Sequence, residues 1–428
     1  MGGHGDLAGG EAAAGREPAA RGVTRRGLLG ALGVGVGGLA VGAAAGYAAA
    51  DAAEPATASE PPVGSVPAPG SMVEPYLGAH QAGIATPLQA HATLVALDLR
   101  EGVDRAALVR LMRLLTDDLA RLTQGRPALA DPQPELAAVP ARLTVTAGVG
   151  MGLLEAAGRA ELAPGWLRDG LPAFAVDQLE PSWSGGDLVL QVAAEDPVTV
   201  SHAVRVLLTD AEPFATVRWL QSGFHRPANT APSGITGRNL FGQVDGTENP
   251  RPGTEDFDQV VWVPPGTSPW LAGGSAMVVR RIAMDLRVWG GLDVATKEAS
   301  IGRRLADGAP LTGGTERTPP DFAAVDADGF PVIPATSHIR LAHLQAQAER
   351  ILRRPYNYDD GVRRDGSAEA GLLFVAFMAD PSAQFVPIQQ RLAEADVLNL
   401  WTTPIGSALF AVLPGVAPGE HLGHALLA

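Results

Sequence analysis

The sequence predicts an α+β protein built from two ferredoxin-like domains with antiparallel sheets. Apolar residues make up 46% of its 428 residues, which allows a large buried core. The first half shows the order strand, helix, strand, strand, helix, strand, which is the ferredoxin-like order. The second half repeats this theme. We therefore expect an N-terminal domain over residues 74–222 and a related C-terminal domain over residues 223–428.

The elements of the first half follow from apolar spacing and one helix cap. Residues 93–99 and 187–193 have the length and apolar density of buried strands. Asp104 is placed to cap a helix over residues 106–122, whose leucines recur on one face. The other elements expected in this half are strands at 143–146 and 215–219 and a helix at 198–208.

The second half is less regular, but the same element types appear. We expect strands at 260–263, 276–284, 372–378 and 407–412, and helices at 297–304 and 387–393. The stretch 308–320 is rich in Pro, Gly and Thr, which predicts a surface loop.

Composition excludes several classes of protein. The net charge of −14 and the absence of a long Lys/Arg run argue against a nucleic-acid partner. The chain has no cysteine, which excludes disulfides, zinc–thiolate sites, iron–sulfur clusters and a cysteine nucleophile. Any bound iron must therefore be held by His, Tyr, Met or a carboxylate.

Residues 1–50 have the layout of an export signal. Arg25 and Arg26 precede an apolar run over residues 28–50 that ends in small residues. The paired arginines resemble a twin-arginine signal, whose export machinery carries folded proteins. We expect an extracellular, periplasmic or cell-surface protein, with residues 51–73 as a flexible linker. The alternative is a membrane anchor, since the run is long enough to span a bilayer, although its Gly and Ala content disfavours one.

Three short segments of the second half stand out, at residues 239–250, 337–343 and 350–358. Taken singly, each is ambiguous. Gly242-x-x-Asp245-Gly246 is a turn signature, His338 is a lone histidine, and Arg353 with Arg354 could form a solvated loop edge. No Ser/His/Asp order, HExxH pair or phosphate-binding glycine loop competes with them.

Together the three segments resemble the dye-decolorizing (DyP-type) peroxidase family. The family's GxxDG signature is similar to residues 242–246, its axial-ligand segment to residues 337–342, and its distal-arginine segment to residues 353–356. Residues 78–84, 371–374 and 380–387 resemble its opening and closing segments. The export signal fits the bacterial branch that includes the deferrochelatase/peroxidase subunits.

The sequence departs from the family pattern at two places. Gln243 and Val244 stand where the family usually has Phe-Lys, and 343–345 reads His-Leu-Gln where the family usually has Asn/His-Pro-Arg. Neither change removes a catalytic residue. The first could alter how the Asp245 loop packs.

The resemblance implies a fold of the dimeric α+β barrel type with one haem b per chain, held mainly by the C-terminal domain. His338 would ligate the iron through Nε2, with His343 as the rival ligand. Its Nδ1–H would donate to a carboxylate, which makes the imidazole a stronger ligand. The family pattern places Asp380 in that role, and the alternative for Asp380 is a helix cap.

The resemblance also implies separate catalytic roles for Asp245 and Arg353. Asp245 would accept a proton from hydrogen peroxide and return it to the outer oxygen. An aspartate stays ionised in mildly acidic solution, where a histidine base would be protonated. Arg353 would stabilise the charge that develops as the O–O bond breaks. Leu372 and Phe374 would wall the pocket with apolar surface.

The implied activity is the reduction of hydrogen peroxide with oxidation of dyes, phenols or other donors. Bulky donors would deliver electrons from the surface, with Tyr356, Tyr358 and Trp401 either as relay residues or simply packed. One alternative is deferrochelatase-like release of iron from haem, and another is a non-catalytic ferredoxin-like binding module. Association into a homo-oligomer stays open.

Overall fold

The computed structural model describes residues 68–227, 230, 236–346 and 348–428. The predicted signal, residues 1–50, and residues 51–67 of the predicted linker lie outside the described residues. The last residues of that linker include a short 3-10 helix, η1 (Pro69–Ser71). Ala141 and Arg142 donate backbone hydrogen bonds to the carbonyls of Gly70 and Met72. The chain is therefore tied to the fold before Pro75, where ordered structure was expected to begin.

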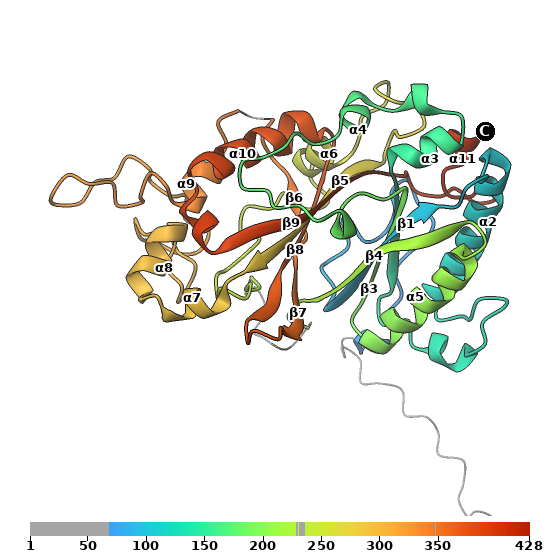
Figure 1. Cartoon of the computed structure of the whole chain (residues 1–428), viewed down its shortest axis with the longest axis horizontal. Helices are drawn as coiled ribbons and strands as arrows, with labels where there is room; N and C mark the ends of the chain where they lie inside the picture. The colour runs from blue at the N-terminus through green and yellow to red at the C-terminus, as the bar shows by residue number, and fades with distance from the viewer. Residues whose placement is uncertain (1–67, 228–229, 231–235, 347) are drawn as a thin grey trace, which may run out of the picture. The chain divides into compact units, whose positions relative to one another are not determined.

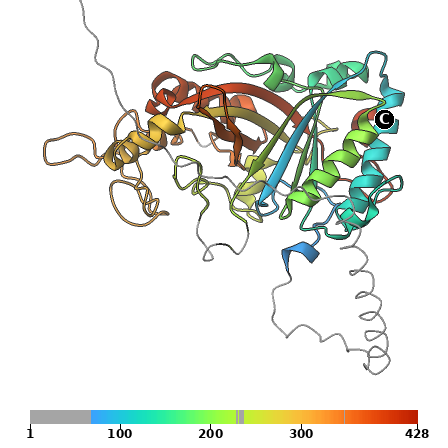
Figure 2. The same cartoon turned by 60° about the horizontal axis from the view of Figure 1, so that its bottom comes forward.

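The first half forms a four-stranded antiparallel sheet in the order β2-β3-β1-β4. Its strands are β1 (His91–Leu99), β2 (Thr144–Val149), β3 (Leu188–Ala194) and β4 (Ala215–Phe224). Helices α2 (Arg105–Leu122) and α5 (Pro197–Ala211) lie side by side against one face (Figures 1 and 2). The ferredoxin-like prediction for this half is confirmed.

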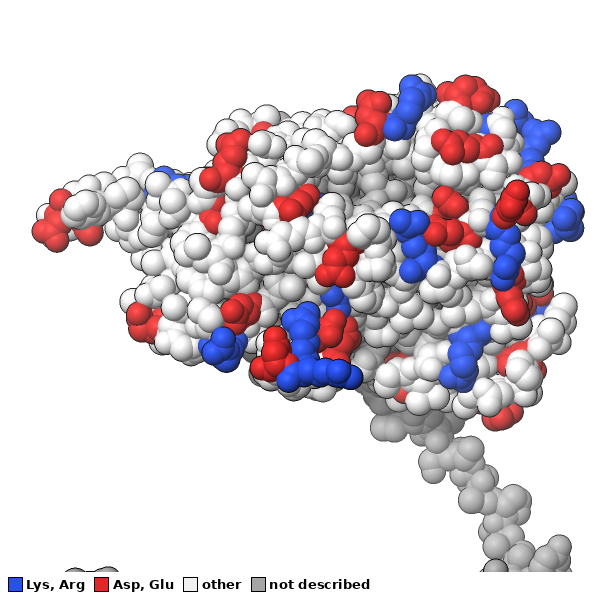
Figure 3. Space-filling view, in the orientation of Figure 1, with Lys and Arg blue, Asp and Glu red and all other residues white. Residues whose placement is uncertain are grey.

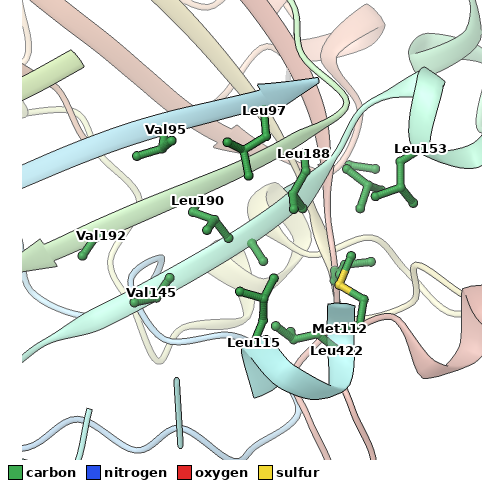
Figure 4. Close-up of a cluster of buried hydrophobic side chains, with 14 of the residues drawn as sticks. Val95, Leu97, Met112, Leu115, Val145, Leu153, Leu188, Leu190, Val192 and Leu422 are labelled. Carbon is green, nitrogen blue, oxygen red and sulfur yellow. The ribbon is translucent and has the colours of Figure 1, made fainter. Parts of the chain in front are cut away.

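Helix α2 has the cap and the apolar face that the sequence predicted. The Asp104 carboxylate accepts a hydrogen bond from Ala107 N at 2.8 Å. Met112 and Leu115 of α2 are buried in one cluster with Val95 and Leu97 of β1 and with residues of β2 and β3 (Figure 4). Burial of this face fixes the helix on the sheet.

The second half repeats the arrangement in the strand order β9-β5-β8-β7. Its strands are β5 (Ser275–Met284), β7 (Tyr356–Val362), β8 (Ala368–Met378) and β9 (Thr402–Val412), with the short β6 (Leu352–Arg353) paired to β8. Its helices are α6 (Glu255–Val261), α7 (Leu286–Gly291), α8 (Val294–Ile301), α9 (His338–Ala342) and α10 (Pro381–Ala395). In both halves the fourth strand lies beside the first and the third beside the second, so the two halves are related.

The two sheets meet at both edges. β2 pairs with β9 at Gly148 and Val149, and β4 pairs with β7 at Phe224. Together with the β5–β8 pairing, these contacts close the sheet on itself. A second apolar core fills the interior with residues from both halves. The described residues form one compact unit, and the boundary between residues 222 and 223 stays a prediction.

The strand predicted at residues 260–263 is wrong. Residues up to Val261 belong to α6, which Thr254 caps by accepting a hydrogen bond from Phe257 N at 3.2 Å. Acidic residues in the first turn favour this helix, and a short apolar run cannot separate helix from strand by itself. The helix predicted at 297–304 is displaced, because Gly302 adopts a φ of 91° and ends α8.

The remaining elements are short. They are α3 (Met151–Ala156), α4 (Gly165–Asp169), α11 (His424–Leu427), η2 (Pro134–Ala138), η3 (Ala160–Leu162), η4 (Pro181–Trp183) and η5 (Val397–Leu400). Residues 308–320 contain no helix or strand, as predicted, but residues 308–310 are buried, so the prediction of a surface loop is wrong there. None of the described helices combines the length and apolar character needed to cross a membrane. On the face drawn in Figure 3, basic and acidic side chains of the described residues are interspersed.

Candidate functional site

A cavity of about 530 Å³ lies beside the segment that carries the GxxDG motif. Its walls come from the loop at residues 84–88, from segments at residues 238–252, and from β6, β7 and β8. The cavity brings together Asp245, Arg353 and Leu372, three residues that the sequence analysis named from separate segments. Its volume is within the range of small-molecule sites.

Two glycines and an asparagine shape the GxxDG loop. Gly242 and Gly246 adopt φ values of 79° and 112°, which glycine adopts without strain. The Asn239 side chain accepts hydrogen bonds from the backbone of Phe241 and Gln243 at 3.0 and 3.2 Å. The loop is therefore held on both sides of the turn that leads to Asp245.

The two residues that depart from the family pattern lie inside this loop. Gln243 is buried, and its Nε2 has no acceptor among the described residues. Val244 packs so closely that a Cβ added to Gly308 would lie 3.0 Å from its Cγ2. Asp245 N still donates to Gly237 O at 3.0 Å, so the loop holds the Asp245 backbone despite both changes.

Arg353 and Asp245 form an ion pair on the cavity wall, with 2.9 Å between Nη1 and Oδ1. Their side chains are 27% and 15% exposed. Asp245 Oδ1 accepts no hydrogen bond of good geometry from the described residues. This oxygen is itself buried against the Arg353 guanidinium, so it holds the ion pair together within the cavity wall.

Asn249 fixes the backbone of Arg353. Arg353 N donates to Asn249 Oδ1 at 3.0 Å, and Asn249 Nδ2 donates to Arg353 O at 2.6 Å. Asn249 belongs to the same loop as Asp245, so one loop positions both charged groups. No pattern in the sequence predicts this role for Asn249, which lies in the segment at residues 239–250.

Arg354 also lines the cavity, and its guanidinium ties the two halves of the chain together. Its guanidinium donates to Thr86 O and, at 3.2 Å, to Gln89 Oε1. Burial lowers the pKa of Arg354, which has neutral hydrogen-bond acceptors here. These bonds hold the loop at residues 84–88 as the cavity wall contributed by the first half.

His225 is a cavity residue that the sequence analysis missed. It follows β4 and lines the same cavity as Asp245. Burial lowers the pKa of His225, while the nearby Asp245 carboxylate acts in the opposite direction. The neutral imidazole is therefore favoured. No sequence pattern links it to residues 242–246.

His338 is the first residue of α9, and its ring is anchored by a carboxylate. Nδ1 lies 2.6 Å from Oδ2 of Asp396, a side chain only 4% exposed. The other oxygen of Asp396 accepts a hydrogen bond from Leu398 N at 2.9 Å. Because Nδ1–H donates to this fixed carboxylate, Nε2 is left with a lone pair suited to a metal ion.

The expected partnership of His338 with Asp380 is wrong. Asp380 caps α10, where Oδ1 accepts a hydrogen bond from Ser382 N at 2.8 Å. Asp396 follows the opposite end of the same helix, which explains why only one of the two reaches His338. The alternative interpretation of Asp380, a helix cap, is confirmed.

His343 does not contact Asp396, and Phe374 does not line the cavity. His343 is exposed and its ring centroid lies 4.9 Å from that of Phe322, so its surroundings differ from those of His338. Phe374 is half-buried against Phe385 and does not line the cavity, whereas Leu372 does.

The end of α8 connects the His338 side of the site to the Asp245 side. A Cβ added to Gly302 would lie 2.7 Å from Cγ1 of Ile339, which follows His338. The next residue, Arg303, donates to Glu316 O at 2.7 Å and lies 3.5 Å from Glu248 of the GxxDG segment. Burial lowers the pKa of Arg303, and the charge of Arg353 lowers it further.

An apolar cluster also borders both sides. It contains Phe241, Met284, Trp289, Leu372 and Trp401, with Phe374, Val397 and Leu398 among the partly buried residues packed on it. Phe241 directly precedes Gly242 of the GxxDG motif, Leu372 lines the cavity, and Val397 directly follows Asp396. The ion pair lines the cavity and the carboxylate-anchored His338 does not, while the apolar cluster includes one cavity residue, Leu372.

The three aromatic relay candidates are packed side chains. Tyr356 and Tyr358 are fully buried in the interior core, and burial raises the pKa of Tyr358 to about 12. The ring centroid of Trp401 lies 5.2 Å from that of Trp289 in the apolar cluster. Their relay role stays a prediction.

Two family models match the chain, covering residues 81–225 and 236–417. Their descriptions are "Dyp-type peroxidase, N-terminal" and "Dyp-type peroxidase, C-terminal". Among curated proteins, a dye-decolorizing peroxidase of Thermobifida fusca (strain YX) is 42% identical over 362 residues, covering 82% of this chain and 84% of the relative. A deferrochelatase of Escherichia coli (strain UTI89 / UPEC) is 37% identical over 373 residues, covering 83% and 87%.

Solved structures agree with these matches. A DyP-type peroxidase from Cellulomonas bogoriensis superposes with a TM-score of 0.82 at 51% identity, covering 84% of this chain and 99% of that one. Ferric DtpA from Streptomyces lividans gives a TM-score of 0.81 at 41% identity, covering 85% and 100%. The similarity therefore extends over both halves of the described fold.

Proposed function

Because this chain belongs to the Dyp-type peroxidase family, we propose that Asp245, Arg353 and His338 are its proton-transferring carboxylate, its charge-stabilising cation and its iron ligand. The chain is a haem-dependent peroxidase, which reduces hydrogen peroxide while it oxidises an electron donor. The observation that carries the residue assignment is the Asp245–Arg353 ion pair on the cavity wall.

The residues present fit a haem. His338 has a carboxylate on Nδ1 and no partner on Nε2 among the described residues, as a histidine ligand requires. The apolar cluster provides a wall for a macrocycle, and the Asp245–Arg353 ion pair lies on the cavity wall. We propose haem b, one per chain: without cysteine the chain cannot attach a haem through thioether bonds, and His338 is the one ligand that we assign.

When bound, haem supplies the iron centre at which peroxide is reduced. Asp245 takes a proton from one peroxide oxygen and delivers it to the other, which converts the departing oxygen into water. Arg353 stabilises the negative charge that develops as the O–O bond breaks, because its guanidinium is always charged and Asn249 fixes its backbone. Leu372 and Ile84 contribute apolar surface to the cavity.

The test of this function is an oxidation assay with the purified holoenzyme. Oxidation of a phenol should require hydrogen peroxide, and the haem should remain intact as a porphyrin–iron complex. Deferrochelatase activity is the second candidate, since curated relatives carry that name. It would instead give iron-free porphyrin, seen by its fluorescence, without a requirement for a phenol.

We expect Asp396→Asn to weaken haem binding by about 10–100-fold, because loss of a metal ligand's hydrogen-bonded partner typically costs that much in affinity or activity. Asp380→Asn is the matched control, because asparagine also caps helices well. It should leave haem affinity unchanged. Haem titration followed by absorbance checks both variants. Equal weakening in the two variants would contradict the assignment of Asp396.

We also propose export by the twin-arginine route, to an extracellular, periplasmic or cell-surface location. The support is the Arg25–Arg26 pair before an apolar run, together with a protein that must fold around its cofactor. Replacing both arginines by lysine should trap folded, haem-loaded protein inside the cell, measured by immunoblots of cell fractions. Unchanged export of this double variant would show that the pair is incidental.

A further inference from the structure

A second cavity of about 320 Å³ shares a wall with the catalytic cavity. Asn249 and Pro250 line both of them. The other residues that line the second cavity are Thr247, Glu248, Arg251, Asp256, Arg317 and Arg350. Three arginines therefore surround one small polar cavity in a chain whose net charge is −14.

The two acidic side chains of this cavity each lie close to an arginine. Asp256 forms an ion pair with Arg350. Glu248 lies 3.5 Å from Arg303, which is not part of this cavity. The lining therefore holds three arginines against two carboxylates, of which Asp256 is paired with Arg350.

Arg251 and Arg317 retain most of their hydrogen-bonding capacity. Both are exposed. Arg317 donates one hydrogen bond, at 3.4 Å, to Thr247 O. The Arg251 side chain has no hydrogen bond or ion pair with any described residue. A guanidinium has five N–H donors arranged to match the two oxygens of a carboxylate or phosphate.

We propose that this cavity binds the oxyanion of a small molecule, a carboxylate or a phosphate group, through Arg251 and Arg317. The lining is almost entirely polar, so it suits the anionic group rather than an aromatic ring. A ligand that enters with its carboxylate keeps its remaining atoms at the rim near Pro250, beside the catalytic cavity. The oxyanion can belong to a carboxylated phenolic donor or to inorganic phosphate.

The version of this proposal in which the ligand is a carboxylated phenol rests on the proposed peroxidase function. In that reaction one hydrogen peroxide takes two electrons and two protons from two phenol molecules, giving two waters and two phenoxyl radicals. A phenol held by its carboxylate would lie against Asn249, the residue that fixes the Arg353 backbone. The site would then favour carboxylated phenols over neutral ones of the same shape.

The experiment compares vanillate, vanillyl alcohol and inorganic phosphate on the holoenzyme at low ionic strength, where exposed charges are least screened. The variant is the double substitution R251Q/R317Q. R110Q/R113Q, which removes two exposed arginines of α2, is the matched control. Calorimetry measures binding of each compound, steady-state assays give KM and kcat for the two phenols, and Soret absorbance per chain reports haem content.

We expect vanillate and phosphate to bind the wild-type protein, and both to bind R251Q/R317Q at least about tenfold more weakly, the equivalent of about 1.4 kcal/mol. The control should bind as the wild type does, and vanillyl alcohol should not bind the cavity. A rise in the KM of R251Q/R317Q by a similar factor for vanillate, but not for vanillyl alcohol, identifies the phenolic donor as the ligand of this cavity. Unchanged KM values with lost phosphate binding identify inorganic phosphate.

Three results would overturn the proposal. The first is no binding of either oxyanion to the wild-type protein. The second is equal binding to R251Q/R317Q. The third is a fall in haem content of that variant, which would assign the arginines to carboxylates of the cofactor itself. Failure of the proposed function is separate, because it would appear as a wild-type protein without peroxide-dependent oxidation.

Discussion

Replacing Arg353 with leucine is expected to slow the reaction with hydrogen peroxide by a factor on the order of 10²–10³, the usual cost of losing one such charge-stabilising donor. Leucine removes the cation 2.9 Å from Asp245 but leaves the backbone hydrogen bonds to Asn249 available. Haem content should therefore be retained. The measurement is the stopped-flow rate of the Soret absorbance change after mixing with peroxide.

Asp245→Asn is the companion variant. It keeps the shape of the side chain and removes the base, and loss of a general base typically costs ~10²–10⁴. We expect Arg353 to matter at least as much as Asp245, because charge stabilisation does not depend on a single proton path. Arg304→Leu is the control, since Arg304 pairs with Asp307 on the surface. A wild-type rate in Arg353→Leu would show that the proposed site is wrong, even in a working peroxidase.

His338→Ala is expected to lose haem or to bind it only weakly. Asp396 is oriented toward Nδ1 of His338, and no other histidine among the described residues forms such a pair next to this site. His343→Ala should keep wild-type haem content, because His343 is exposed against Phe322. Haem content is measured as Soret absorbance per chain. The reverse pattern, with haem lost only in His343→Ala, would contradict the assignment of His338.

Elements with a clear repeat or cap could be predicted from the sequence. The apolar face of α2 and its cap Asp104 depend on residues that are close in the chain, so both can be recognised from residue spacing. Residues 260–263 carried no such repeat, so the helix that Thr254 caps was mistaken for a strand. The short β6 and β7 were missed because their pairing depends on β8, which follows them in the chain.

The candidate site also contains features that could be predicted from the sequence and features that could not. Asp245, His338 and Arg353 could be named because each lies in a short motif of its own. Contacts between distant segments could not, as the partner of His338 shows: Asp380 and Asp396 flank one helix, and only the packing of α9 against α10 decides which carboxylate reaches the ring. Asn249 and His225 likewise reach the cavity through contacts that no spacing predicts.

The central claim is that this chain binds haem at His338 and uses it to reduce peroxide. Its most direct test is the absorption spectrum of the purified chain as haem is added, followed by addition of hydrogen peroxide. We expect a Soret band that saturates at one haem per chain and changes rapidly with peroxide. Absence of a saturable Soret band, or a band that peroxide does not alter, would contradict the account.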